Sequence, residues 1–165
     1  MKRSIRGSFA VLALLLLASP AARADVSEAV QKKFKGQILV SSEPLPDSAT
    51  DEAELIRQLK KAHTGLLTHS KGESVPVWRF HFMAFMDRKP SATQVSLDFY
   101  TDDKKKAFVA QKRLAGIDQT LTLLQAEVEL SEDDGLAADR SYAVKLTCEV
   151  KGKEVVLATT KLRTK

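Results

Sequence analysis

Hydrophobic and polar residues alternate along most of the chain beyond residue 35, with the two-residue period of strands that bury one face. The clearest case is the segment 141–150, in which every second residue is apolar or aromatic: Tyr142, Val144, Leu146, Cys148 and Val150. Gly152 can adopt the positive φ of a tight reversal, and residues 155–162 then return as a second β-rich run. This pattern predicts a β-hairpin.

Five further segments are predicted as strands, each followed by a turn-forming or proline-containing sequence. They span 36–42, 77–86, 93–100, 106–114 and 120–130. The segment 77–86 is bulky on both faces, so we expect a central strand whose second face is partly covered. In 106–114, alternation places Phe108, Ala110 and Leu114 on one face.

One segment, 51–63, has the pattern of a helix. Thr50 is the expected N-cap, basic residues crowd the last turn, and Gly65 follows as a stop signal. Its narrow apolar stripe is Leu55, Ile56, Leu59 and Ala62. We expect this stripe to pack over a sheet edge or an open end of the fold; docking of a partner helix is the alternative. Residues 25–35 are read as a weakly helical lead-in.

Seven strands at intervals near ten residues, without α/β alternation, predict the fold class. We expect an all-β protein, a seven-stranded antiparallel β-sandwich with one inserted helix, as a single domain over 36–165.

The sequence Asp139-Arg140-Ser141-Tyr142, with the alternating apolar residues that follow, resembles the entry to the penultimate strand of immunoglobulin-like and fibronectin type III-like domains. The resemblance covers about residues 126–162. It implies a two-sheet sandwich in which the Tyr142 hydroxyl bonds back to the preceding loop. It implies nothing about activity, because such sandwiches host many functions.

The first 24 residues have the organisation of a cleaved leader. Lys2, Arg3 and Arg6 precede the apolar run 9–18, and Ala22-Arg23-Ala24 predicts cleavage between Ala24 and Asp25. The apolar run is shorter than the about 20 residues that span a bilayer, so we expect no stable membrane insertion after cleavage. The expected location is the periplasm or the outside of a bacterial cell.

Charge and cysteine content narrow the function classes. Four of the 26 basic residues lie in the leader and none of the 21 acidic residues does, which leaves 22 basic against 21 acidic residues. This balance gives no reason to expect nucleic acid or anionic membranes as partners. Cys148 is the only cysteine, so no internal disulfide can form, and we expect it to be buried as a small hydrophobic residue.

No arrangement of residues suggests catalysis. His63, His69 and His81 lie outside any nucleophile motif, and the seven glycines form no phosphate-binding loop. We therefore expect no enzyme activity, no catalytic residues and no cofactor.

His81 and Met83 are the candidates for a metal site. They share one face of the strand 77–86, and imidazole and thioether are ligands that copper accepts in oxidising compartments. Asp25, as a new N-terminus, could add an amine and a carboxylate. Two ligands do not make a site, and the other interpretation is that Met83 packs under the helix while His81 reaches the rim.

Acidic residues cluster in the loop before the final hairpin, at Glu132, Asp133, Asp134 and Asp139. Carboxylates bind Ca²⁺, but these acids lack the spacing of a calcium loop. We expect a solvated loop.

The expected function is a non-catalytic binding or structural module that contacts an unknown protein partner in the cell envelope. The proposed contact is an exposed strand edge, at 154–164 or at 37–42, which offers unpaired backbone groups. The alternatives are a periplasmic carrier of a small ligand or of copper at the His81/Met83 face, and an enzyme with an unrecognised site.

Overall fold

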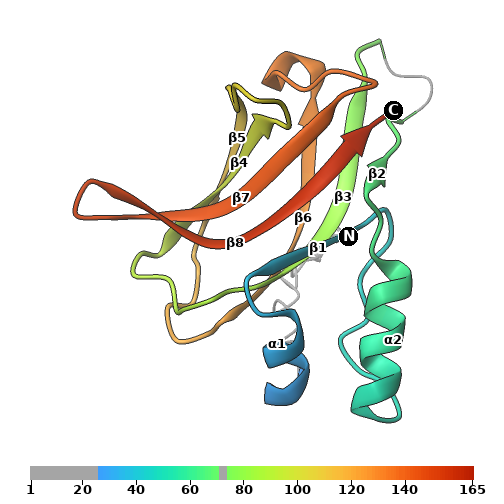
Figure 1. Ribbon diagram of the computed structural model, residues 1–165, viewed down its shortest axis with the longest axis vertical. Coiled ribbons are helices and arrows are strands. Elements are labelled where there is room, and N and C mark those ends of the chain that lie inside the picture. The colour runs from blue at the N-terminus through green and yellow to red at the C-terminus, as the bar shows by residue number, and fades with distance from the viewer. Residues whose placement is uncertain (1–25, 71–73) are drawn as a thin grey trace, which may run out of the picture.

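The computed structural model describes residues 26–70 and 74–165 (Figure 1). The predicted leader, 1–24, and the cleavage site at Ala24 and Asp25 lie outside the described residues. Among the described residues, no helix is long and apolar enough to cross a membrane. The elements in chain order are α1 (Glu28–Phe34), β1 (Gln37–Ser41), α2 (Glu52–Ala62), β2 (Leu66–Leu67), β3 (Val77–Phe85), β4 (Gln94–Thr101), β5 (Phe108–Ala115), β6 (Leu123–Ser131), a 3₁₀ helix (Glu132–Asp134), β7 (Ser141–Val150) and β8 (Lys153–Thr164).

All eight strands of the described residues belong to one mixed sheet. Its main path runs β5-β4-β7-β8-β1-β3-β6, with β2 beside β8, and the sheet curls until it is nearly closed (Figure 1). The prediction of a mostly β protein is confirmed. The two-sheet sandwich and the resemblance to immunoglobulin-like and fibronectin type III-like domains are wrong. Alternation of apolar and polar residues shows only that each strand has one buried face. A curled sheet satisfies that pattern as well as a sandwich does.

β8 joins the two halves of the sheet. From Lys153 to Arg163 it pairs with β7, with one irregularity, and on its other side it pairs in parallel with β1 at Thr159 and with β2 at Arg163 and Thr164. The predicted strand edges at 37–42 and 154–164 are therefore wrong for β1 and for the C-terminal half of β8. Pairing between residues so distant in sequence depends on the tertiary fold, and no local pattern reports it. The strands at the two ends of the sheet are β5 and β6.

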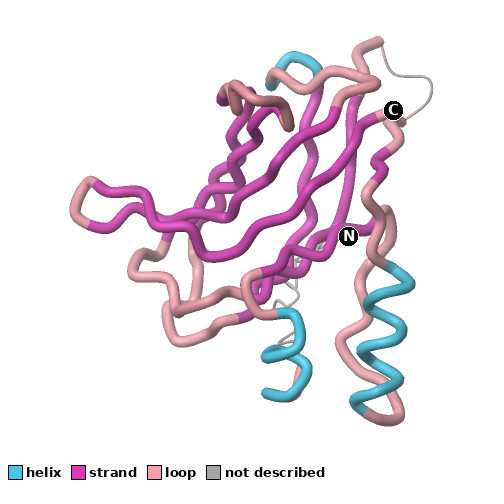
Figure 2. Tube along the Cα trace, viewed as in Figure 1, coloured by secondary structure: helices cyan, strands magenta, loops and turns pink. Residues whose placement is uncertain are grey.

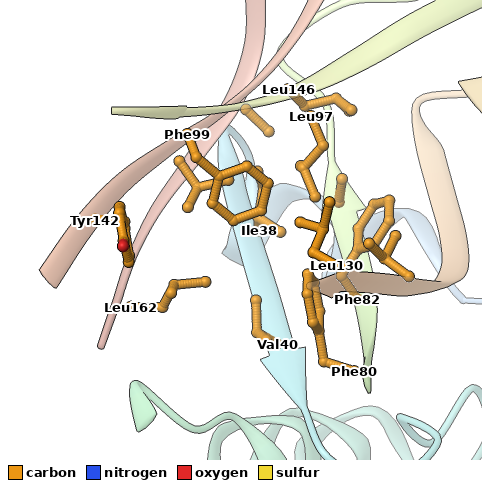
Figure 3. Close-up of a cluster of buried hydrophobic side chains, with 14 of the residues drawn as sticks. Ile38, Val40, Phe80, Phe82, Leu97, Phe99, Leu130, Tyr142, Leu146 and Leu162 are labelled. Atoms are coloured by element: carbon orange, nitrogen blue, oxygen red, sulfur yellow. The ribbon is translucent and has the colours of Figure 1, made fainter. Parts of the chain in front are cut away.

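The inner face of the curled sheet forms the main hydrophobic core (Figure 3). Side chains from opposite parts of the sheet point towards one another there, among them Ile38, Phe80, Leu97, Phe99, Leu130 and Leu146, all at most 1% exposed. Each such side chain contributes about 1.5–3 kcal/mol of transfer free energy. Cys148 belongs to the same core, as predicted.

A second hydrophobic cluster lies on the outer face of β1 and β3, beneath α1 and α2. Figure 2 shows the two helices at one end of the molecule. The prediction that the strand 77–86 has a covered second face is confirmed. The cluster also explains why α2 lies on the sheet face and not at an edge, since its stripe finds its apolar counterpart there. Its buried members are Val26, Val30, Phe34, Leu39, Leu45, Leu55, Leu59, Met83 and Phe85.

The two helices differ from the predictions in detail. Asp51, not Thr50, is the N-cap of α2, and its Oδ1 accepts a hydrogen bond from the Glu54 backbone amide at 2.8 Å. α1 is more than a lead-in, because Phe34 is buried and its ring lies 5.1 Å from that of Phe85. The sequence 25–35 is too short to indicate this anchoring by itself.

A β-bulge changes the facing of β5. The register between β4 and β5 shifts at Phe99/Tyr100, so that Tyr100 pairs with Phe108. Phe108 therefore lies on the outer face and is 57% exposed, whereas alternation predicted it on the same face as Ala110. One extra residue reverses the facing of the residues beyond it.

β7 and β8 project from the body as a long hairpin (Figure 1). Its turn has positive φ at Lys151 (52°) and Gly152 (74°), the pair of values that a type I′ turn requires. At the other end of β7, the Tyr142 hydroxyl accepts a hydrogen bond from the Ala137 amide at 2.8 Å. The predicted bond from Tyr142 to the preceding loop is therefore confirmed, although the fold is a different one.

Candidate functional site

The two copper-ligand candidates lie on the outer face of β3 in different surroundings. Met83 is fully buried in the cluster beneath the helices, so apolar side chains surround it. His81 is half-buried, with Ser41 of β1 and Glu127 of β6 as its cross-strand neighbours. This arrangement agrees with the interpretation in which Met83 packs under the helix and His81 reaches the rim. Asp25, the third candidate ligand, lies outside the described residues.

The carboxylates of the loop after β6 are held separately. Asp134 Oδ2 accepts hydrogen bonds from the backbone amide and the hydroxyl of Ser131, at 2.7 and 2.9 Å, and these two bonds lower the pKa of Asp134. Asp139 Oδ1 lies 3.8 Å from the Arg163 guanidinium. Within residues 26–70 and 74–165, no three His, Cys, Asp or Glu side chains come together as metal ligands. Asp134 closes a turn, and the acidic residues of the loop are exposed, as predicted for a solvated loop.

A polar cavity of about 510 Å³ lies on the outer face of the half of the sheet that the helices leave uncovered. β4 and β5 line one side of it, and the β7–β8 hairpin lines the other. The outward positions of β4 alternate with inward residues such as Leu97, so the sheet supplies the polar lining directly. The charged and amide-bearing side chains at the cavity include Asp98, Gln111, Arg113, Glu149 and Glu154.

Asp98 is the most deeply placed of these groups, at 2% exposed. Its Oδ1 accepts a hydrogen bond from Gln111 Nε2 at 2.8 Å, and its Oδ2 accepts one from the Thr147 hydroxyl at 2.6 Å. Each oxygen thus has one neutral donor from a neighbouring strand. A carboxylate can accept about four hydrogen bonds, so Asp98 has capacity for further donors.

Arg113 orients the amide of Gln111. Its Nε donates to Gln111 Oε1 at 2.9 Å, and this bond fixes which end of the amide faces Asp98. The result is a chain of hydrogen bonds along β5 and β4 from Arg113 through Gln111 to Asp98. Such a chain holds the buried carboxylate in one orientation.

Tyr100 lies beside the cavity, close to Lys145 and to the carboxylates of the lining. Lys145 Nζ lies 4.4 Å from the centroid of its ring and 4.0 Å from Glu154 Oε1. Burial, and then the carboxylates of Glu154 and Asp98, raise the pKa of Tyr100.

A second feature is the seam between β5 and β6, the end strands of the sheet. Among the described strands, β5 pairs only with β4, and β6 pairs only with β3. Half-buried apolar side chains of both strands, and of the segment between them, pack against the main core: Val109, Leu114, Ile117, Leu124 and Ala126. The core is thus incompletely covered along the seam.

One end of the seam is covered by the loop that contains the 3₁₀ helix. Gly135 approaches β5 so closely that a Cβ there would lie 2.5 Å from the Val109 carbonyl oxygen, and its φ is 107°. The loop bridges the two end strands without adding a strand.

Sequence reasoning identified neither the cavity nor the seam. Asp98 alternates with Leu97 and Phe99, which places it at an outward position of β4, and nothing in this alternation indicates that it is buried. The seam depends on strand order, which no local pattern gives. The one available signal was the polar composition of outward positions on β4, β5 and β7, in contrast to the apolar outward residues Met83 and Phe85 of β3.

In comparisons with protein families, curated proteins and solved structures, no match to this chain was found.

Proposed function

We propose that the protein is a non-catalytic binding module of the bacterial cell envelope, and that it binds an extended segment of a partner protein at the seam. The partner segment adds as a strand between β5 and β6, in the mode known as β-augmentation. The predicted periplasmic or secreted location is part of this proposal.

The observation that supports it is the pair of end strands beside a half-covered core. An unpaired strand edge offers backbone amide and carbonyl groups to an incoming chain, and the sheet has two such edges within its described residues. The half-buried Leu114, Leu124 and Ala126 offer the apolar contact that alternate side chains of the added strand need.

The chemistry of the edges favours a protein partner that is bound selectively. β5 presents Lys112 and Arg113, whereas β6 presents Glu127 and Glu129. Charged residues on an edge strand oppose indiscriminate pairing, so a partner strand must match both sides.

Site-specific photocrosslinking in living cells tests this proposal. A photoreactive residue at Lys112, in the middle of β5, should crosslink to one discrete protein, and the same residue at Lys151, in the hairpin turn, should not. The crosslinked partner segment is then synthesised as a peptide and added to the purified protein.

Hydrogen exchange with the bound peptide gives the decisive result. Protection of amides in β5 and β6 supports strand addition at the seam. Protection elsewhere, or equal crosslinking from Lys112 and Lys151, contradicts it.

A further inference from the structure

A charged side chain, that of Lys112 in β5, lies on the inner face of the sheet at the seam. Lys112 is directly opposite Leu97 in the β4–β5 ladder, and Leu97 belongs to the main core. Opposite residues of an antiparallel ladder share one face of the sheet, so Lys112 is on the inner face. The next residues of β5 on that face, Ala110 and Leu114, are apolar and pack in the same core.

Lys112 is half-buried in this position and forms no ion pair within the part of the chain that the structure describes. No described Asp or Glu oxygen lies within the 4.0 Å of an ion pair with its ammonium group. The charge of Asp134 interacts with that of Lys112 at a longer distance, but Asp134 Oδ2 accepts its hydrogen bonds from Ser131. The ammonium group therefore depends on water.

A strand added beside β5 would remove much of that water. Val109 and Leu114 are partly buried, like Lys112, so the added strand would cover all three side chains together. A buried ammonium group is strongly unfavourable unless a counter-charge lies beside it. A partner segment with an apolar or basic residue opposite Lys112 is therefore discriminated against, and one with a carboxylate there is favoured.

An inward-pointing lysine on an end strand also has a simpler explanation, since it opposes edge-to-edge pairing between copies of a protein. That explanation accounts for strands that are excluded. It does not account for the half-covered apolar residues on both sides of the seam, such as Leu114 of β5 and Leu124 of β6. These residues favour a strand that binds, and the lysine then sets which strand it is.

We propose that the seam selects a partner segment of alternating apolar residues with one Asp or Glu, whose carboxylate faces the core and pairs with the Lys112 ammonium group. The inference rests on the proposed strand addition and specifies the chemistry of the added strand. A photoreactive residue in place of Lys112 still captures this partner, because backbone bonds and apolar contacts remain and the covalent product accumulates.

Selection from a displayed library of random eight-residue peptides, the length of β5, tests the inference on the purified protein. Peptides selected by the original protein should share alternating apolar residues and one acidic residue. Peptides selected by Lys112→Glu should carry Lys or Arg at the same place in the pattern. Selected peptides without a preferred acidic residue, or the same peptides from both proteins, would overturn the inference.

Titration of one selected peptide measures the contribution of the pair. Replacing its acidic residue by the matching amide should weaken binding by ~10-fold or more, the range for hydrogen bonds to charged groups. Lys112→Met keeps a long unbranched side chain, so the fold should be retained. It should weaken binding of the acidic peptide to a similar extent and have little effect on the amide peptide.

The matched control is Lys153→Met, which removes the same charge from an exposed position on the β7–β8 hairpin and should leave binding unchanged. Equal effects of Lys112→Met and Lys153→Met would contradict a pair at the seam.

Hydrogen exchange separates this inference from the proposed function. A peptide that protects amides of β5 and β6, but whose affinity does not depend on Lys112, would leave strand addition intact and overturn the pairing. If the selected peptides protect other parts of the protein, or none is selected, strand addition at the seam is contradicted and the pairing with it.

Discussion

The outer surface of the curled sheet has two halves that differ in the polarity of their residues and in what covers them. On β1 and β3, outward residues such as Met83 and Phe85 are apolar, and α1 and α2 cover them. On β4, β5 and β7, outward residues such as Asp98 and Thr147 are polar, and no helix lies over them in the described chain. Both halves nevertheless bury side chains: on the second half, Asp98 is 2% exposed and is hydrogen-bonded by Gln111 and Thr147 of the neighbouring strands.

The two halves also differ in how much they contribute to the free energy of folding. The helix-covered half contributes free energy of folding through apolar contacts, at about 25 cal/mol per Å² removed from water. The uncovered half buries a carboxylate, which is a weak source of stability.

The largest expected effect tests the covered half. Phe85→Ala should destabilise the protein by about 3–5 kcal/mol, because the ring is 1% exposed and packs against Phe34. Chemical denaturation measures the change. The control is Phe108→Ala on the uncovered half, where the ring is mostly exposed and the loss should be no more than about 1 kcal/mol. Equal losses would show that the two halves do not differ in this way.

The second prediction concerns closure of the uncovered half, which depends on a loop. Gly135→Ala should destabilise the protein by roughly 2–4 kcal/mol, because the added Cβ meets the Val109 carbonyl and the φ of 107° is strained for alanine. Gly152→Ala also has a positive φ, but no atom lies within 4 Å of its Cβ, so it should cost only about 1 kcal/mol. A cost for Gly135→Ala that does not exceed the cost for Gly152→Ala would argue against a close contact between the loop and β5.

The third prediction tests whether the Asp98 hydrogen bonds are formed. Thr147→Val keeps the shape of the side chain but removes the donor to Asp98 Oδ2, and should cost about 1–3 kcal/mol. The comparison variant is Thr160→Val, since Thr160 makes no side-chain hydrogen bond to another described residue. If thermal denaturation finds the two variants equally stable, Asp98 is hydrated and not buried.

The smallest expected effect is a dependence on pH. Hydrogen bonds from Ser131 lower the pKa of Asp134 in the folded protein, so Asp134 stabilises the fold above its unfolded-state pKa. That stabilisation is lost as the pH falls through the lower, folded-state pKa. Asp134→Asn should therefore lower the melting temperature slightly at neutral pH, and the difference from the original protein should vanish once the pH is below the folded-state pKa of Asp134.

Asp133→Asn is the control for this measurement, because Asp133 accepts no hydrogen bond from the described residues. A difference between Asp134→Asn and the original protein that grows towards low pH would contradict the assigned direction of the pKa change.

The sequence predicts the strands because local alternation depends on which face of each strand is buried. It places Tyr142 and Cys148 correctly, and the bulk on both faces of 77–86 predicts the covered face of β3. It cannot give strand order, because a parallel pair such as Gln37 and Thr159 is formed by residues far apart in the chain. It also misplaces Phe108, since a single bulge reverses the facing that alternation predicts.

The candidate sites were less predictable than the fold. Asp98 has the alternating position of a solvated outward residue, but it is 2% exposed and is hydrogen-bonded by side chains of two neighbouring strands, which the sequence does not identify. The His81/Met83 pair was visible in the sequence, but the two side chains lie in different environments. A pattern along one strand shows which residues share a face and not what covers that face.

Cys148 lies where the β7–β8 hairpin leaves the body of the protein, and it is the only thiol of the chain. A maleimide can react with it only when that region opens, because the side chain is 4% exposed. The rate of its alkylation therefore measures how often the base of the hairpin opens. This rate can be measured in the unaltered protein without adding a probe.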